Sequence, residues 1–135
     1  MFWGDSMAAR VLLVDDEPTL LRAIKRLLIY RFDVTTASSG EEALSILRST
    51  ESFDCVISDM KMPQMDGLEL VNQIVEHWPA TVCIILTGNQ DEDTLNRISN
   101  FNTVFRLLNK PTPGDELIAA VESAVRETNT NRVKP

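Results

Sequence analysis

Apolar and polar positions along the chain fall into two alternating patterns. Five short runs are mostly apolar at successive positions, which is typical of strands covered on both faces. The runs are VLLV (11–14), VTTA (34–37), CVIS (55–58), VCIIL (82–86) and VFRLL (104–108). Amphipathic segments with helical spacing lie between and after them. This alternation predicts an α/β fold, a doubly wound (βα)5 unit in which helices cover both faces of a five-stranded parallel sheet.

The predicted helices differ in the strength of their signals. Apolar residues at helical spacing predict helices over 20–28 and 117–125. A capping box of Ser39 and Glu42 marks the start of the second helix, and the third helix has an apolar face over 68–75 that stops before Pro79. The segment around 91–100 has mainly Leu95 and Ile98 as apolar anchors among charged and amide residues. Because a narrow apolar stripe docks weakly on a core, we expect this fourth helix to move easily.

Composition and charge narrow the function classes. The 135 residues suit one domain, and 13 basic against 20 acidic residues give a formal net charge of −7. An acidic chain has no general attraction for nucleic acid or an anionic membrane, and it suits a hard cation or a basic protein partner. Cys55 and Cys83 lie in apolar runs and are expected to be buried free thiols. No apolar stretch is long enough to span a bilayer. Because free thiols are expected in place of a disulfide framework, the expected compartment is the cytoplasm.

Reactive side chains gather at the predicted carboxyl ends of the strands, where open α/β sheets bind their ligands. The first strand is followed by Asp15 and Asp16, the third ends at Asp59, the fourth at Thr87, and the fifth precedes Lys110. Three carboxylates at one edge repel one another unless a cation lies among them. Mg²⁺ (or Mn²⁺) fits best, because it needs few protein ligands and keeps waters for a phosphoryl substrate.

Carboxylates, a hydroxyl and an ammonium around a metal match a phosphoryl-transfer site. A carboxylate can itself be the nucleophile and form an aspartyl phosphate. Lys110 would neutralise phosphoryl oxygens as a point charge, and the Thr87 hydroxyl could donate to one of them.

Each of these residues also has a purely structural interpretation. Asp16 or Glu17 could cap the helix that begins at the following proline, and Asp66 could cap the helix after the DMKMPQMDG turn. Thr87 could simply end a strand, and Lys110 could be a solvated surface residue. The functional interpretation rests on all of these groups occurring together, since four strand ends of one predicted sheet carry them.

Four motifs, VLLVDDEP, VISDMKMPQMDG, IILTG and LLNKP, follow one another in a specific order and spacing. With them the chain resembles the receiver domain of bacterial two-component response regulators, over about residues 9–127. The resemblance implies a flavodoxin-like strand order of 2-1-3-4-5. It leaves 1–8 as an N-terminal extension and 128–135 as a polar C-terminal tail or linker. The polar composition of 126–135 itself favours a frayed end or a linker.

The resemblance also implies the metal and phosphoryl ligands. Asp59 is the expected phosphoacceptor, and it receives the phosphoryl group from a histidine kinase or phosphotransfer protein. Asp15 and Asp16 resemble the acid pair that binds the metal, with Asp16 the direct ligand. Asp59 and the backbone carbonyl of Lys61 complete the expected metal ligands.

The implied switch has one departure from the family pattern. Thr87 resembles the hydroxyl that moves onto the phosphoryl group, and Lys110–Pro111 resembles a peptide bond that is cis in the family. The family usually has Tyr or Phe three residues before the lysine, but here that residue is Leu107, with Phe105 on the same strand face. The aromatic half of the switch is therefore in doubt, while the phosphorylation is not.

The resemblance implies a signalling role and not a turnover enzyme. Phosphorylation would change the surface of the fourth helix, fifth strand and fifth helix, which controls an output domain or a downstream effector and allows a phosphorylation-dependent dimer. LTGNQD and FRLLNKP are similar to receivers attached to signalling enzymes, and no direct nucleic-acid binding is expected.

A haloacid-dehalogenase-like phosphatase is the alternative. It also uses a strand-end aspartate, Mg²⁺, a hydroxyl and a lysine, and VDDEPT resembles its motif, with Glu17 and Thr19 in the places of the second acid and the threonine. Against it, no paired-acid motif follows Lys110, and Asp59 is left without a role.

Overall fold

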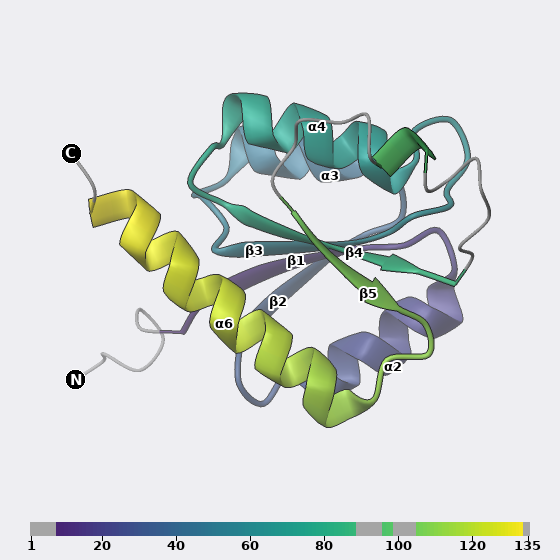
Figure 1. The fold of residues 1–135 in the computed structure, drawn as a ribbon, viewed down its shortest axis with the longest axis horizontal. Helices are drawn as coiled ribbons and strands as arrows, with labels where there is room; N and C mark the ends of the chain where they lie inside the picture. The colour runs from purple at the N-terminus through teal and green to yellow at the C-terminus, as the bar shows by residue number, and fades with distance from the viewer. Residues whose placement is uncertain (1–7, 89–95, 99–104, 134–135) are drawn as a thin grey trace.

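The computed structural model describes residues 8–88, 96–98 and 105–133. Five parallel strands form one sheet in the order β2-β1-β3-β4-β5 (Figure 1). Their bounds are β1 Arg10–Val14, β2 Asp33–Ala37, β3 Cys55–Asp59, β4 Val82–Thr87 and β5 Arg106–Asn109. The flavodoxin-like α/β fold and its strand order are therefore confirmed.

Helices cover both faces of the sheet (Figure 1). Their bounds are α2 Pro18–Leu28, α3 Gly40–Ser49, α4 Gly67–His77 and α6 Gly114–Val133. Helices α3 and α4 lie on one face, and α2 and α6 lie on the other. Residues 96–98 are helical, and the rest of the predicted fourth helix lies outside the described residues. None of the described helices has the length and apolar character that crossing a bilayer requires.

Two apolar clusters lie on either side of the sheet, as expected for strands covered on both faces. Every residue of β3 and β4 is buried, whereas the edge strands β2 and β5 are partly exposed. Cys55 belongs to the cluster under α2 and α6, and Cys83 belongs to the cluster under α3 and α4. Both cysteines are buried free thiols, as predicted. Burial in an apolar core raises the pKa of the Cys83 thiol to about 12, which disfavours the nucleophilic thiolate form.

Two of the three predicted helix caps are present. The Ser39 side chain accepts from the Glu42 N–H, while the Glu42 carboxylate turns to the Ser38 N–H. Asp66 forms a complete capping box for α4. Glu17 occupies the N-cap position of α2 but makes no side-chain cap hydrogen bond. The acids after β1 are therefore not accounted for by helix capping.

The fifth strand begins later than the apolar run suggested. Phe105 precedes β5 and packs against the core cluster under α3 and α4. Leu107 is 36% exposed on the strand itself. Residue 104 lies outside the described ranges.

The expectation of a frayed end from residue 126 is wrong up to Val133, because α6 continues to that residue. Polar side chains hold this last part of the helix to the amino-terminal edge of the sheet. The buried Thr128 hydroxyl donates to the Asp54 carbonyl over 2.5 Å, and the Arg132 guanidinium pairs with the Asp54 carboxylate over 2.5 Å. The segment is polar because it pairs with strand-start residues, which local composition does not reveal.

Candidate functional site

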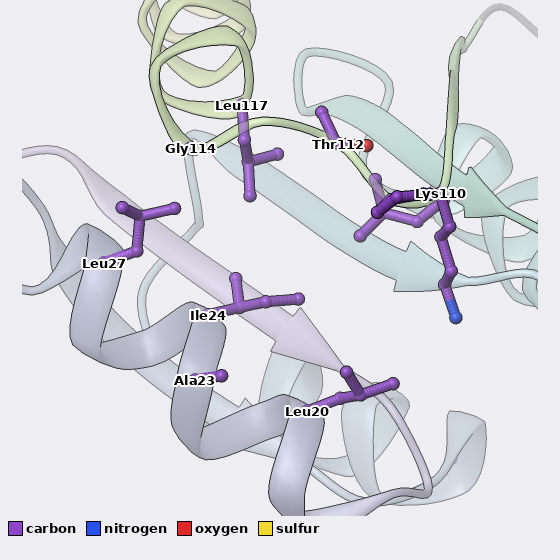
Figure 2. Close-up of a pocket in the computed structure, with 10 residues that line it drawn as sticks. Leu20, Ala23, Ile24, Leu27, Lys110, Thr112, Gly114 and Leu117 are labelled. Atoms are coloured by element: carbon purple, nitrogen blue, oxygen red, sulfur yellow. The ribbon is translucent and has the colours of Figure 1, made fainter.

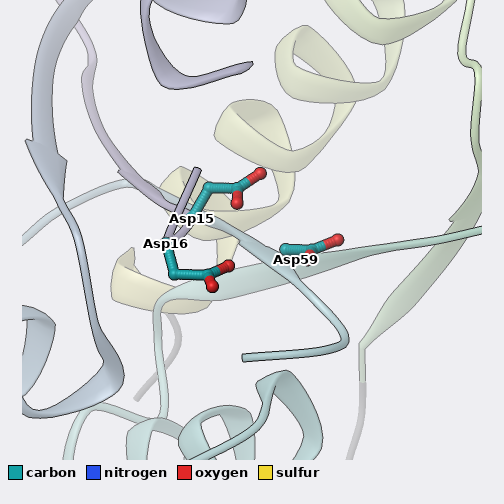
Figure 3. Close-up of side chains that lie close together, drawn as sticks. All are labelled: Asp15, Asp16 and Asp59. Atoms are coloured by element: carbon teal, nitrogen blue, oxygen red, sulfur yellow. The ribbon is translucent and has the colours of Figure 1, made fainter. Parts of the chain in front are cut away.

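Three aspartates meet at the carboxyl end of the sheet, as predicted. Strands β1 and β3 are neighbours in parallel register, so the residues that end them emerge side by side. One carboxylate oxygen from each of Asp15, Asp16 and Asp59 lies within 4.8 Å of the other two (Figure 3). Asp15 and Asp59 are buried, and Asp16 is exposed. The cluster therefore has two fixed carboxylates and one that faces solvent.

Lys110 supplies the opposing charge. Its Nζ forms an ion pair with Asp59 Oδ1. The Lys110 N–H also donates to the Thr87 carbonyl over 2.9 Å, which joins the ends of β4 and β5. The Lys110–Pro111 peptide bond is cis, as the resemblance implied. Three carboxylates and one ammonium leave a formal charge of −3 + 1 = −2, which a divalent cation would neutralise.

Asp15 has an electrostatic environment that favours such a cation. Burial raises the pKa of its carboxyl above the usual range, and the nearby charges of Asp59 and Asp16 raise it further. A hydrogen bond of 2.9 Å from the Glu17 N–H and the charge of Lys110 act in the opposite direction. A buried acid whose charge is disfavoured gains stability when a cation binds.

Thr87 ends β4 and is 2% exposed. Leu86 is the register partner of Asp59, so Thr87 lies one residue beyond the phosphoacceptor candidate on the neighbouring strand. The structure therefore brings Thr87, Lys110 and the three aspartates to one edge. Lys61 follows β3 with an exposed side chain, and its proposed role as a carbonyl ligand stays a prediction.

Gly67 was not selected from the sequence, yet it supports Asp59 directly. A Cβ at this position would lie 2.3 Å from the Asp59 carbonyl oxygen and 3.0 Å from Met60 Cα. The Gly67 N–H donates to the Met60 carbonyl over 2.8 Å. The first turn of α4 therefore packs on the backbone that carries the candidate nucleophile, and only glycine permits that approach.

An apolar cavity of about 480 Å³ opens beside Lys110, between α2 and the start of α6 (Figure 2). Leu20, Ile24, Leu27 and Leu117 line it. Its walls add no carboxylate to the cluster, so the acidic site and the apolar cavity are chemically distinct neighbours.

Comparison with known proteins identifies close similarity over most of the chain. The family model described as "Response regulator receiver domain" matches residues 11–122. Transcriptional regulatory protein GlrR of Escherichia coli (strain K12) is 37% identical over 121 residues, which are 89% of this chain and 27% of that protein. The chain thus spans about a quarter of the length of this curated relative.

Solved structures agree with this result. A response regulator receiver domain protein from Clostridium thermocellum has a TM-score of 0.81 at 37% identity, covering 90% of this chain and 98% of that one. A structure described as an adenylate cyclase from Rhodopirellula baltica has a TM-score of 0.83 at 38% identity, covering 92% of both chains. None of these matches supports the phosphatase alternative.

Proposed function

The chain belongs to the response regulator receiver domain family, and from this premise we propose that Asp59 is its phosphoacceptor. The observation that carries the proposal is the ion pair between the Asp59 carboxylate and Lys110, inside a cluster of three carboxylates. Lys110 holds one Asp59 oxygen in place, and Asp16 is the exposed member of the cluster.

The residues fit a divalent metal site. Asp15, Asp16 and Asp59 are oxygen donors with excess negative charge, as Mg²⁺ or Mn²⁺ requires. Burial is the main cause that raises the pKa of Asp15, and the charges of Asp59 and Asp16 add to it, which supports a cation among the three carboxylates. The Lys61 carbonyl is the fourth proposed protein ligand. When bound, the metal would neutralise charge on the phosphoryl oxygens.

The chain's own residues then carry out the transfer. An Asp59 carboxylate oxygen attacks the phosphorus of the donor's phosphohistidine; the P–O bond forms as the P–N bond breaks, and the imidazole leaves with the electron pair. Lys110 transfers its ion pair from the carboxylate to the new phosphoryl oxygens. The Thr87 hydroxyl donates a hydrogen bond to one of the phosphoryl oxygens, and its movement shifts the chain that follows β4. That movement is the proposed switch.

The donor and the output are proposals of the same kind. We propose a histidine kinase or phosphotransfer protein as donor and a cytoplasmic setting, which the buried free thiols support. The curated relatives include transcriptional regulatory proteins, and one solved relative is described as an adenylate cyclase. Downstream, the proposal includes an attached output domain or a separate effector and dimerisation on phosphorylation. It includes no direct contact with nucleic acid.

The stoichiometry of the reaction tests the proposal. Radiolabelled acetyl phosphate is supplied in excess with Mg²⁺, and bound label and released phosphate are both counted. We expect incorporation to stop at one phosphoryl group per chain and to be lost in EDTA. In this proposal the chain promotes only its own phosphorylation and dephosphorylation. Steady release of phosphate over many turnovers without accumulation of label would instead indicate a phosphatase.

A further inference from the structure

An ion pair joins the helical turn at 96–98 to the start of α4. Arg97 Nη1 lies 2.7 Å from Asp66 Oδ2, and the side chains are 38% and 20% exposed. The adjacent Ile98 packs against the apolar cluster that α4 also enters. Among the contacts of the described residues, a polar pair and an apolar contact therefore both attach the turn to the α4 side of the fold. The residues of the polar pair are 31 positions apart in the sequence.

The two carboxylate oxygens of Asp66 have separate partners. Oδ1 accepts from the Glu69 N–H over 2.9 Å and caps α4, while Oδ2 accepts from Arg97. The Glu69 carboxylate accepts the reciprocal hydrogen bond of the capping box from the Asp66 N–H over 3.0 Å. Because capping uses only one oxygen, helix α4 does not require Arg97. The second oxygen is available for a different role.

Asp66 is also tied to the phosphoacceptor. Its neighbour Gly67 packs on the Asp59 carbonyl so closely that a Cβ would come within 2.3 Å. The Gly67 N–H donates to the Met60 carbonyl over 2.8 Å. A shift of the backbone at Asp59 is therefore passed to Asp66 through direct contacts, and from there to Arg97.

We propose that the Arg97–Asp66 pair is a latch that holds the 96–98 turn in its unphosphorylated position and so sets the fraction of chains in the switched state. The proposal rests on the proposed function, in which Thr87 moves the chain that follows β4. A charge-assisted hydrogen bond weakens steeply when its partners separate, so displacement of the turn from α4 loses the pair. The contact then stabilises the resting state alone. Arg97 acts as a positioning residue.

Loss of a contact that stabilises only the resting state raises the affinity of any ligand that binds preferentially to the switched state. Partly exposed pairs contribute up to about 1 kcal/mol, which corresponds to about a two- to five-fold change in affinity. The probe is beryllofluoride, a phosphoryl mimic, titrated in saturating Mg²⁺ against wild type, Arg97→Ala, Asp66→Asn and the double variant. We expect each single variant to bind the mimic about two- to five-fold more tightly, and the double variant no more tightly than either.

The variants separate the latch from other effects. Asp66→Asn keeps an oxygen for the cap, and the amide N–H of Glu69 reports by NMR whether that bond persists. The two substitutions change net charge in opposite directions, so a common gain in affinity cannot come from general electrostatics. Arg31→Ala is the matched control, because it removes an exposed ion pair with Glu122, and it should leave binding unchanged.

The outcomes are distinct. If wild type binds the mimic and either single variant binds it equally or less tightly, the latch is refuted while the phosphoacceptor proposal stands. If wild type does not bind the mimic at all, the proposed function fails, and the latch fails with it. Mg²⁺ affinity measured alone should be the same in all four proteins, since neither side chain belongs to the three-aspartate cluster.

Discussion

The acidic cluster should make the metal-free chain less stable than a variant that lacks one of its charges. Asp16→Asn is the suitable perturbation, because Asp16 is exposed and its replacement leaves no cavity. The same substitution removes a proposed metal ligand. The variant is therefore expected to be more stable than wild type without metal and less stable with it.

The magnitude follows from the geometry. Each carboxylate pair separated by at most 4.8 Å repels by about 0.9 kcal/mol in a water-like dielectric and by about 3.5 kcal/mol at an effective dielectric of about 20. Asp16 is exposed, so the lower value applies to its two pairs, and Lys110 offsets part of the pair with Asp59. We expect Asp16→Asn to raise the free energy of unfolding by about 1 to 2 kcal/mol in EDTA.

Bound Mg²⁺ should reverse this order of stability between wild type and Asp16→Asn. A ligand at 100 times its dissociation constant stabilises the folded state by about 2.7 kcal/mol. Wild type should gain this amount at saturating Mg²⁺, and Asp16→Asn should gain much less. The stability curves of the two proteins therefore cross as Mg²⁺ is raised.

Urea denaturation in EDTA and in a series of Mg²⁺ concentrations measures both effects. Asp33→Asn is the matched control, because it removes an exposed charge at the opposite, amino-terminal end of a strand, and it should retain the full stabilisation by Mg²⁺. Equal stabilisation of wild type and Asp16→Asn by Mg²⁺ would refute the assignment of Asp16 as a metal ligand. A loss of stability in EDTA would refute the claim that the cluster is under charge repulsion.

Three further outcomes are expected. Because burial raises the pKa of Asp15 above 3.8, this carboxyl holds its proton to a higher pH in the folded than in the unfolded chain, and its contribution to metal-free stability should fall as pH rises through the raised value. The fall should be absent in Asp15→Asn, and identical pH profiles of the two proteins would contradict the assignment. Gly67→Ala should cost about 1 to 3 kcal/mol in urea denaturation and slow phosphorylation, since its Cβ would meet the Asp59 carbonyl. Gly88→Ala, whose Cβ would meet Lys110 at 3.7 Å, should be nearly neutral in stability, and equal losses in both would show that the close contact is unimportant. Leu107→Ala should leave the beryllofluoride-induced NMR shifts at Gly88 and 96–98 intact, because Leu107 is already 36% exposed; their disappearance with the mimic still bound would make that side chain an essential switch element.

The parts of the fold and site that the sequence predicts are those with a local signal. Runs of apolar residues mark the strands, and the parallel arrangement places their carboxyl ends at one edge of the sheet. The strand order implied by the family resemblance makes β1 and β3 neighbours, so the meeting of Asp15, Asp16 and Asp59 could be expected. The Asp66 cap is likewise visible as a short motif.

The remaining contacts depend on long-range pairing. Arg132 lies 78 residues from Asp54, and Arg97 lies 31 residues from Asp66, so nothing near either residue indicates its partner. The end of α6 looked like a tail because its polar residues face other polar residues of the sheet edge, not solvent alone. Gly67 was hidden for a similar reason, since a glycine after Asp66 also fits an ordinary turn.

Mass-spectrometric mapping of the phosphorylated residue shows whether Asp59 is the phosphoacceptor. The chain is incubated with acetyl phosphate and Mg²⁺, trapped, digested and analysed by mass spectrometry, together with Asp59→Ala. We expect a single adduct at Asp59 and none in the variant. An adduct at Asp15, or full phosphorylation of Asp59→Ala, would contradict it.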